Sequence, residues 1–314
     1  GTAHFVFLLG DNFSQLAFAC AVEPLRIANR VAGRTLYRWT LASADGVSAA
    51  CSNRSVTLVD IGLEPLRHVD RLLVIAGDQV QRCTTPGILT YLPRERAAGT
   101  PLGAICSGAY VLANAGFLDG QAAAVHWEYH DLFAEVFPRV RLVRGVFVAD
   151  QKVITAAGGT AAADLMLHLI AAGHGPDLAT AVADQMVYNA VREASAEQRV
   201  SLQSRHGSRN PHLMRAVALV RQNIEDPLSP GRIAGALAIS TRQLERLFLR
   251  HLGTSPKRFI IETRLMRARN LLVQTDQSIT EVAVACGFTT PSHFSKVYRA
   301  HFGVSPVAQR STLG

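Results

Sequence analysis

The sequence predicts an α/β domain with a doubly wound, mostly parallel sheet, followed by an all-α domain with two helix-turn-helix units. Over residues 1–170, short apolar runs ending in turn residues alternate with helical patterns, which is typical of a parallel sheet covered on both faces. From residue 212 onward only helical patterns occur, and a short signature is repeated. The 314 residues suffice for two domains. We expect them at 1–193 and 212–314, with a polar linker at 194–211.

The predicted strands of the first domain end at turn-forming residues. Strands are expected at residues 4–9, 38–42, 56–59, 71–76, 101–105 and 152–155, and helices at 16–31 and 161–172. Ligands of doubly wound sheets bind beyond the carboxyl ends of the strands. The junctions at Asp11, Asp78, Cys106 and Gly159 therefore predict the location of a ligand site.

Composition limits the environment in which the chain works. The five cysteines contain no C-x-x-C pair, which argues against a disulfide framework or a zinc site and fits a reducing cytoplasm. No run of about 18 apolar residues occurs, and the first residues lack the form of a signal peptide, so we expect no membrane association. We expect no metal and no cofactor.

The positive charge is confined to the predicted all-α domain. Residues 212–314 hold 14 Lys and Arg against 6 Asp and Glu, a net charge of +8. The rest of the chain holds 18 residues of each sign and is neutral. A basic module attached to a neutral one indicates a polyanionic partner for that module alone, although a basic surface that is merely solvated would show the same charge.

The all-α domain repeats itself. The sequence G-T-S-P at residues 253–256 recurs as G-V-S-P at 303–306, 50 residues later. At the same offset Leu244 matches Phe294, Arg246 matches Lys296, and Phe248 matches Tyr298. Each repeat predicts a short helix, a turn and a second helix. The turns fall at residues 238–239 and 287–288, and a long helix over 256–274 joins the repeats.

The second helix of the first repeat carries a row of arginines. Leu244 and Phe248 form its buried stripe, while Arg242, Arg246 and Arg250 recur every four residues on another face. Aligned arginines repel one another unless an anion faces them. A helix-turn-helix presents such a face to the major groove, where Arg reads guanine. A helical bundle with a solvated basic face also explains one such row, but the tandem repeat favours DNA binding.

Residues 215–309 resemble the AraC/XylS-type DNA-binding domain. The stretches S-T-R-Q-L-E-R-L-F-x-R-H-L-G-x-S-P and I-T-E-V-A-x-A-C-G-F-x-x-x-S-H-F-S-K-V-Y-R-x-H-F-G-V-S-P carry the resemblance. It implies base-reading positions on the second helix of each unit, and the basic start of the joining helix suggests phosphate contacts. The predicted DNA contacts are Arg242, Gln243, Arg246 and Arg250 in the first unit, Ser292, His293 and Lys296 in the second, and Lys257 and Arg258 on the joining helix.

The segment G-A-I-C-S-G at residues 103–108 has the form of a nucleophile elbow, a strand, a tight turn and a helix. Small neighbours permit the strained backbone that lifts Cys106 above the sheet. A helix N-terminus there is expected to lower the pKa of the thiol. His126 is a candidate partner, since a reactive cysteine requires a nearby base. The alternative is a buried structural cysteine and an unrelated surface histidine.

Residues 4–190 resemble the class I glutamine-amidotransferase-like superfamily, a flavodoxin-like fold that includes the intracellular protease PfpI. Joined to an AraC-type domain, this arrangement resembles the GlxA family of regulators. The segments at residues 22–29, 36–39 and 44–46 are similar to the branch that controls catabolism of betaine, carnitine or arginine. The resemblance implies a cytoplasmic transcription activator of catabolic genes. It implies a small nitrogenous effector, RNA polymerase as a partner, and a homodimer formed through the N-terminal domain.

One departure argues against catalysis. PfpI-like enzymes hold the nucleophile with a Glu four residues before a Pro on the first helix, and Cys20 takes that place here, counting back from Pro24. Glu23 lies three residues further on, about 300° around the helix. We therefore expect a binding pocket and no enzyme. Two alternatives are a Cys-dependent amidase or protease and a redox sensor that acts through oxidation of Cys106.

The predicted effector pocket gathers the residues that follow the strands. Trp127 and Phe13 are candidates for cation–π contact with a quaternary ammonium group, although core packing is the alternative for both. Asp11, Asp78 or Glu23 would supply the countercharge. The predicted ligand-binding residues are Asp11, Asn12, Phe13, Glu23, Asp78, Gln79, Cys106, Ser107, His126 and Trp127.

Overall fold

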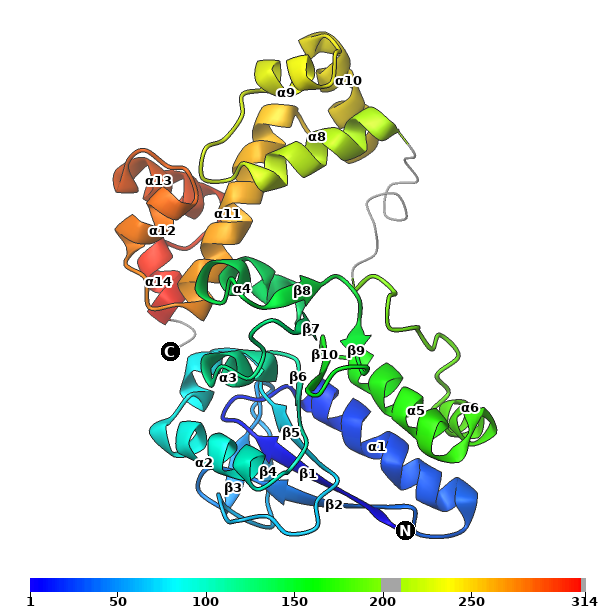
Figure 1. Ribbon diagram of the computed structural model, residues 1–314. Helices are drawn as coiled ribbons and strands as arrows, with labels where there is room; N and C mark the ends of the chain where they lie inside the picture. The colour runs from blue at the N-terminus through cyan, green and yellow to red at the C-terminus, as the bar shows by residue number, and fades with distance from the viewer. Residues whose placement is uncertain (199–209, 312–314) are drawn as a thin grey trace. The chain divides into compact units, whose positions relative to one another are not determined.

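The computed structural model describes residues 1–198 and 210–311, which belong to two compact units that divide between residues 199 and 200 (Figure 1). The predicted linker, residues 194–211, lies mostly outside the described residues. Its first residues, 194–198, belong to the first unit and not to a linker, because the carbonyl of Ala194 accepts the N–H of Val146 at 3.0 Å and Gln198 Nε2 donates to the carbonyl of Gly145 at 3.0 Å.

The first unit is built on a six-stranded sheet with the order β2-β1-β5-β6-β10-β9. The strands are β1 Ala3–Leu9, β2 Tyr37–Ala42, β5 Arg71–Ile75, β6 Leu102–Ile105, β9 Phe147–Val148 and β10 Ile154–Ala156. All neighbours pair in parallel except β9, which runs antiparallel to β10. Since the chain order reverses on either side of β1, the sheet is doubly wound, and the predicted fold class is confirmed.

Helices cover both faces of this sheet (Figure 1). On β1, Phe5, Phe7 and Leu9 pack into a core with α1, α5 and α6, while Val6 and Leu8 pack on the opposite face with α2, α3 and α4. A strand with both faces buried reads as a continuous apolar run, which is why β1 was visible in the sequence. The helices are α1 Gln15–Ala32, α2 Pro86–Ala97, α3 Gly108–Asn114, α4 His130–Val136, α5 Ala161–His174 and α6 Pro176–Gln185.

Smaller elements surround the sheet. The hairpin β3 Ser48–Ala50 with β4 Val56–Leu58 is antiparallel, and β7 Ala122–Ala124 pairs in parallel with β8 Arg141–Val143. Two 3-10 turns, η1 Val80–Cys83 and η2 Trp127–Tyr129, follow strands β5 and β7. These turns lie at the junctions where the sequence predicts a ligand site.

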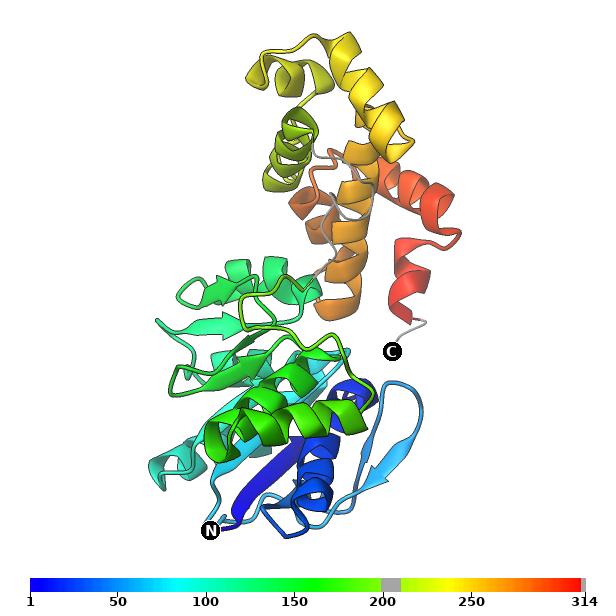
Figure 2. The same cartoon turned by 90° about the vertical axis from the view of Figure 1, so that its right-hand side faces the viewer.

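Helices are the regular secondary structure of the second unit in its described residues, and turns connect them. They are α8 Pro211–Gln222, α9 Pro230–Ala236, α10 Thr241–Leu252, α11 Pro256–Gln274, α12 Ile279–Ala285, α13 Pro291–Phe302 and α14 Pro306–Ser311. Leu244 and Phe248 of α10 belong to one small core, and Phe294 and Tyr298 of α13 belong to another. Helix α11 passes from the first group of helices to the second and supplies residues to both cores (Figure 2). Both predicted helix-turn-helix units are present.

Candidate DNA interface and effector site

Helix α10 is the second helix of the first helix-turn-helix unit. It begins with a capping box in which Ser240 Oγ accepts the N–H of Gln243 and Gln243 Oε1 accepts the N–H of Ser240, at 3.2 and 2.8 Å. It ends at Gly253, whose left-handed φ of 65° terminates the helix. One face is closed by the fully buried Leu244 and Phe248. The side chain of Gln243, a predicted DNA contact, thus also holds the start of the helix.

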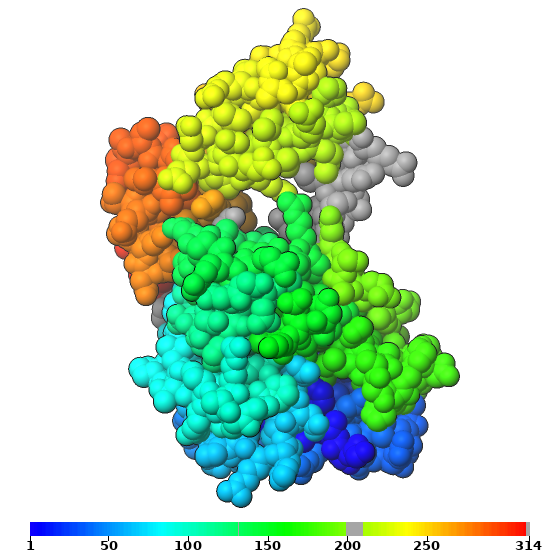
Figure 3. All heavy atoms as spheres, in the orientation of Figure 1, coloured from blue at the N-terminus to red at the C-terminus, as the bar shows by residue number. Residues whose placement is uncertain are grey.

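The opposite face of α10 presents the predicted arginine row. Arg242, Arg246 and Arg250 are all exposed. Within the described residues, none of the three forms an ion pair. Helices α9 and α10 form the yellow surface at the end of this unit in Figure 3. Three unpaired cations on one exposed helical face form a surface complementary to a phosphate backbone or to guanine edges.

Helix α13 is the equivalent helix of the second unit. Thr290 caps it by accepting the N–H of His293 at 3.2 Å. Phe294 and Tyr298 are fully buried, and their rings lie 5.5 Å apart. The predicted contacts Ser292, His293 and Lys296 are exposed on the other face. Helices α10 and α13 therefore bury residues at equivalent positions and differ in the side chains that they expose.

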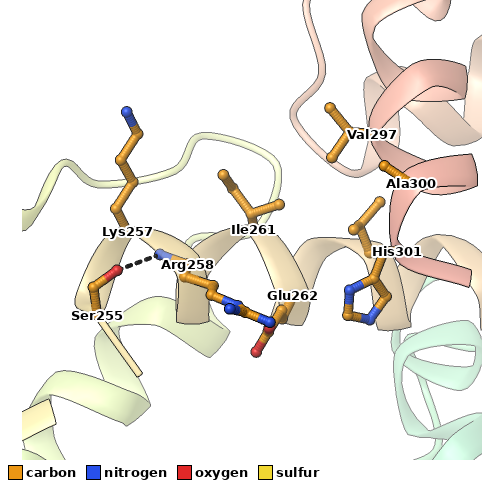
Figure 4. Close-up of a pocket in the computed structure, with 9 residues that line it drawn as sticks. Ser255, Lys257, Arg258, Ile261, Glu262, Val297, Ala300 and His301 are labelled. Carbon is orange, nitrogen blue, oxygen red and sulfur yellow. Dashed lines mark hydrogen bonds and ion pairs between the residues drawn. The ribbon is translucent and has the colours of Figure 1, made fainter. Parts of the chain in front are cut away.

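The start of α11 carries the two remaining predicted DNA contacts. Lys257 and Arg258 are both exposed, but Arg258 Nε donates to Glu262 Oε1 at 2.8 Å. A hollow of about 340 Å³ lies between the start of α11 and α13. Figure 4 shows Lys257 extending from the helix, with Val297, Ala300 and His301 of α13 on the other side. An intrahelical carboxylate partly neutralises Arg258, so Lys257 is the stronger candidate for a phosphate contact.

In the first unit, left-handed backbone recurs where the strands end. Asn12 follows β1 with φ 63°, Gln79 follows β5 with φ 54°, Cys106 follows β6 with φ 59°, and Gly158 follows β10 with φ 105°. Non-glycine residues in this region are uncommon and concentrate at functional sites. The predicted ligand-binding edge of the sheet is thus made of sharply turned junctions.

Cys106 sits at the tightest of these junctions. Its exposed fraction is 8%, and a Cβ on Gly158 would lie 2.7 Å from the Cβ of Cys106. The N–H of Cys106 donates to the carbonyl of Ala156 at 2.9 Å. Burial raises the pKa of the thiol to about 11, although the N–H of Ser107 favours the thiolate. The expectation that a helix start lowers this pKa is wrong, because burial outweighs the short helix α3.

The predicted Cys–His couple is not assembled. Among the described residues, no hydrogen bond joins Cys106 to His126, whose Nδ1 instead accepts the N–H of Glu128 at 3.4 Å. Burial lowers the pKa of His126, and the neighbouring carboxylate of Glu128 opposes that shift. Ser107 Oγ and the hydroxyl of Tyr129 both donate to the carbonyl of Gly77, at 2.6 and 3.1 Å. These bonds tie together the chain segments that follow β5, β6 and β7.

The polar residues predicted for the pocket lie at the surface where β1 and β5 end. Asp78 is exposed and Gln79 is partly exposed, and Asn12 Nδ2 donates to the carbonyl of Asp78 at 3.0 Å. Asp11 is also exposed, with Oδ2 at 3.8 Å from Arg82 Nη1. The structure therefore brings the ends of β1 and β5 together, as predicted.

The aromatic candidates and Glu23 lie in different surroundings. Phe13 is fully buried and packs edge-on against Phe18, with ring centroids 5.8 Å apart, so it belongs to the core, which was the alternative for this residue. Trp127 is partly exposed beside the ring of His126, at 5.5 Å between centroids. Glu23 is partly exposed and accepts hydrogen bonds from the guanidinium of Arg26.

The structure contains a buried ion pair, Asp164 with Arg192, that the sequence pattern did not predict. Asp164 is 1% exposed and accepts the Nε–H of Arg192 at 2.9 Å and the hydroxyl of Tyr188 at 3.0 Å. Arg192 Nη2 also donates to Thr160 Oγ1 at 2.7 Å. The burial of Cys20 and the charge of Asp164 raise the pKa of the Cys20 thiol. An aspartate inside the apolar run of α5 was the available signal, since a buried charge requires a partner.

Each of the two units matches a known protein family. Residues 4–172 match the DJ-1/PfpI family, and residues 233–312 match a helix-turn-helix domain. The HTH-type transcriptional regulators GbdR and CdhR of Pseudomonas aeruginosa are each 43% identical, over 97% and 98% of this chain and 83% and 92% of their own lengths. The regulator GlxA of Rhizobium meliloti is 37% identical over 98% of this chain and 95% of its own.

Solved structures match the first unit. An AraC family transcriptional regulator from Pseudomonas putida superposes with a TM-score of 0.53 and 26% identity, covering 59% of this chain and 99% of that one. Drosophila melanogaster DJ-1beta, with a TM-score of 0.50 and 19% identity, covers 60% of this chain and 98% of its own and shares the fold.

An α/β domain joined to a tandem helix-turn-helix domain with an exposed arginine row defines a DNA-binding transcriptional regulator. The chain belongs to the GlxA-type HTH regulators, which combine a DJ-1/PfpI domain with an AraC-type DNA-binding domain. The predicted resemblance and the predicted regulatory function are thereby confirmed. None of the helices in the described ranges is both long and apolar enough to span a lipid bilayer.

Proposed function

We propose that the chain is a transcription activator of catabolic genes that responds to a small nitrogenous metabolite bound by its first unit. The regulatory part of the proposal is carried by the tandem helix-turn-helix domain with its exposed arginine row. The ligand-binding part rests on Cys106, which is only 8% exposed and is joined to His126 by no hydrogen bond of the described residues. A protonated, nearly buried thiol is a poor nucleophile, so the junctions around it suit ligand binding better than catalysis.

The proposed effector site is the exposed rim over Cys106. Asp78 supplies negative charge, Asp11 adds a carboxylate that lies 3.8 Å from Arg82 Nη1, and Gln79, His126 and Trp127 supply polar and aromatic surface. Such a rim suits a ligand with a cationic nitrogen. We propose that binding there changes the affinity of the second unit for its operator.

The test is DNA binding in the presence of metabolites. A labelled operator, obtained by selection from random DNA, is titrated with the full chain alone and with betaine, dimethylglycine, carnitine, choline or arginine. We expect at least one of these compounds to change operator affinity, and Asp78→Asn to weaken that response without changing affinity in the absence of ligand. If no small nitrogenous compound changes operator binding, the proposed effector function is wrong.

A Cys-dependent enzyme is the second candidate, favoured by the left-handed backbone at Cys106. We propose that the chain is not an enzyme. Amide hydrolysis by the wild type that disappears in Cys106→Ser would contradict this proposal. A redox sensor would show operator binding that depends on peroxide and on Cys106, whose side chain is only 8% exposed and therefore poorly accessible to an oxidant.

We further propose that the chain works in the cytoplasm as a homodimer formed through its first unit, in contact with RNA polymerase. The proposal rests on the tandem reading helices, since regulators of this architecture occupy repeated sites. Sedimentation velocity of the full chain at tens of micromolar checks the dimer, and a single monomeric species would contradict it. Transcription with purified polymerase on the selected operator checks the activation.

A further inference from the structure

The first unit ends in a segment without a helix or strand of its own, residues 188–198, which we call the strap. It follows α6 and is the last described part of the first unit, since the first helix of the second unit begins at Pro211. An irregular segment keeps a fixed course only where its polar groups find partners. The strap has such partners at both of its ends.

The N-terminal end of the strap is held by a buried charge. Asp164 of α5 is 1% exposed and accepts the hydroxyl of Tyr188 at 3.0 Å and the backbone N–H of Arg192 at 2.9 Å. The guanidinium of Arg192 completes the ion pair and also donates to Thr160 Oγ1 at 2.7 Å. Because opening this end would leave a buried charge without its partner, we expect it to stay closed.

The C-terminal end of the strap is held by neutral hydrogen bonds. Gln198 Nε2 donates to the carbonyls of Val125 and Gly145, at 3.0 Å each. The carbonyl of Ala194 accepts the N–H of Val146 at 3.0 Å, and a Cβ on Gly145 would overlap that carbonyl. Gln198 Oε1 is buried and accepts no hydrogen bond from the described residues. Since neutral hydrogen bonds contribute little net stability and an unsatisfied buried oxygen is unfavourable, this end is the easier one to open.

The weaker end of the strap contacts the chain beside the proposed effector site. Val125 is fully buried and directly precedes His126, a residue of the proposed rim. The carbonyl of Val146 accepts the N–H of Ala157 at 2.8 Å, one residue before the junction at Gly158. A ligand that displaces either segment therefore displaces a hydrogen-bonding partner of the strap.

We propose that the strap couples the effector site to the DNA-binding unit, an inference that rests on the proposed effector function. A ligand in contact with the His126 segment releases Gln198, while the Arg192 end stays fixed. Such a ligand must bind the released form more tightly than the closed one. Residues 194–198 then add to the reach of the chain toward the second unit, by about 3.5 Å for each residue. Because the reach of a tether sets the effective concentration of the unit that it carries, release raises operator affinity.

Hydrogen exchange of the full chain without ligand tests whether Gln198 holds the strap. Gln198→Ala should speed exchange in residues 194–198 and at the Val146 amide about tenfold, and leave the Arg192 amide unchanged. Gln198→Met has nearly the same shape, cannot donate, and should act alike. Gln151→Ala is the matched control, because the side chain of this partly exposed glutamine forms no hydrogen bond within the described parts of the chain. Thermal unfolding checks that each variant is folded.

Operator affinity of the same full-length proteins, again without ligand, tests the coupling. Gln198→Ala and Gln198→Met should raise operator affinity about threefold or more, and Gln151→Ala should leave it unchanged. If Gln198 had only a structural role, its loss would speed exchange and leave operator affinity as it was. Unchanged or lowered operator affinity in both Gln198 variants therefore overturns the proposal, as does unchanged exchange.

The outcomes separate the strap from the proposed function. If the five metabolites named above include one that changes wild-type operator affinity, while Gln198→Ala does not change it, the strap is overturned and the effector function stands. If Gln198→Ala raises operator affinity while no metabolite changes that of the wild type, the hold of the strap on the second unit is supported and the proposed effector function is refuted.

Discussion

The two helix-turn-helix units bury residues at equivalent positions of their second helices, but they differ at the turn and in the exposed side chains of that helix. In the first, the turn is made by Ala238 with φ 54°, and in the second by Gly287 with φ 72°. Arg264 of α11 clamps the second turn by donating to the carbonyls of Cys286 and Gly287 at 2.8 and 2.5 Å. No side chain of the described residues clamps the first turn in this way.

The exposed side chains of the two second helices differ more than their buried side chains do. The first unit presents three arginines, and the second presents Ser292, His293 and Lys296. Arginine binds phosphate and guanine in a bidentate manner, whereas lysine acts as a point charge. We therefore expect the first unit to supply most of the affinity for DNA. The turn of the second unit is held more firmly, by Arg264, but its exposed helix face should bind DNA more weakly.

The largest expected effect is on the folding of the second unit. A Cβ on Gly287 would lie 2.6 Å from the carbonyl oxygen of Ile224 and 2.7 Å from that of Glu225, at a positive φ. Gly287→Ala should therefore cost about 3 kcal/mol of stability, from backbone strain and overlap together. Urea unfolding followed by far-UV circular dichroism measures this. An unchanged midpoint of urea unfolding would contradict this, because it would show that the turn accommodates a Cβ at residue 287.

The next effect is on DNA affinity and compares matched positions. If Arg246 makes the proposed bidentate contact, Arg246→Ala should weaken operator binding by about 2 kcal/mol, roughly thirtyfold. Lys296→Ala, at the equivalent position 50 residues later, should cost about 1 kcal/mol. Fluorescence anisotropy at fixed salt measures both variants. A larger loss for Lys296→Ala would reverse the proposed division of labour between the units.

A smaller effect of the opposite sign is expected at the first turn. Ala238 adopts φ 54° without a glycine's freedom, so Ala238→Gly should raise the stability by up to about 1 kcal/mol. The same urea titration measures it beside Gly287→Ala. Destabilisation by Ala238→Gly would show that the loss of the Ala methyl outweighs the relief of strain.

The smallest effect is on the salt dependence. Lys257→Ala should weaken binding to all sequences alike and reduce the slope of log affinity against log salt by about 1. Arg258→Ala should change the slope less, because Glu262 already pairs with Arg258 at 2.8 Å. Titrations at several salt concentrations, on operator and on unrelated DNA, check both variants.

The DNA-binding unit could be predicted closely because its signals are local. Helix α11 has the predicted bounds, since Ser255 caps its start by accepting the N–H of Arg258 and the pattern ends at Gln274.

The short strands of the first unit were harder to predict. The predicted strand at residues 152–155 begins later, as β10 Ile154–Ala156. The very short β9 has no periodicity to read.

The candidate effector site could be predicted only in part. The order of the strands brings Asp11 and Asp78 to the same edge, which topology alone predicts. The state of Cys106 depends on contacts with Gly158 and Tyr129 that are distant in sequence, so the elbow pattern indicated the turn and not the burial. The ion pair of Asp164 with Arg192 joins residues 28 positions apart and had no local signal beyond a charge in an apolar helix.

The central claim is that α10 and α13 read two successive major grooves. Selection of binding sites from a random DNA library, with the wild type, Arg246→Ala and Lys296→Ala, tests it directly. We predict that each variant relaxes base preference in one half of the site, at positions about ten base pairs apart, the spacing of one helical turn. Changes at the same base pairs in both variants, or at none, would contradict tandem reading and leave the arginine row as a solvated surface.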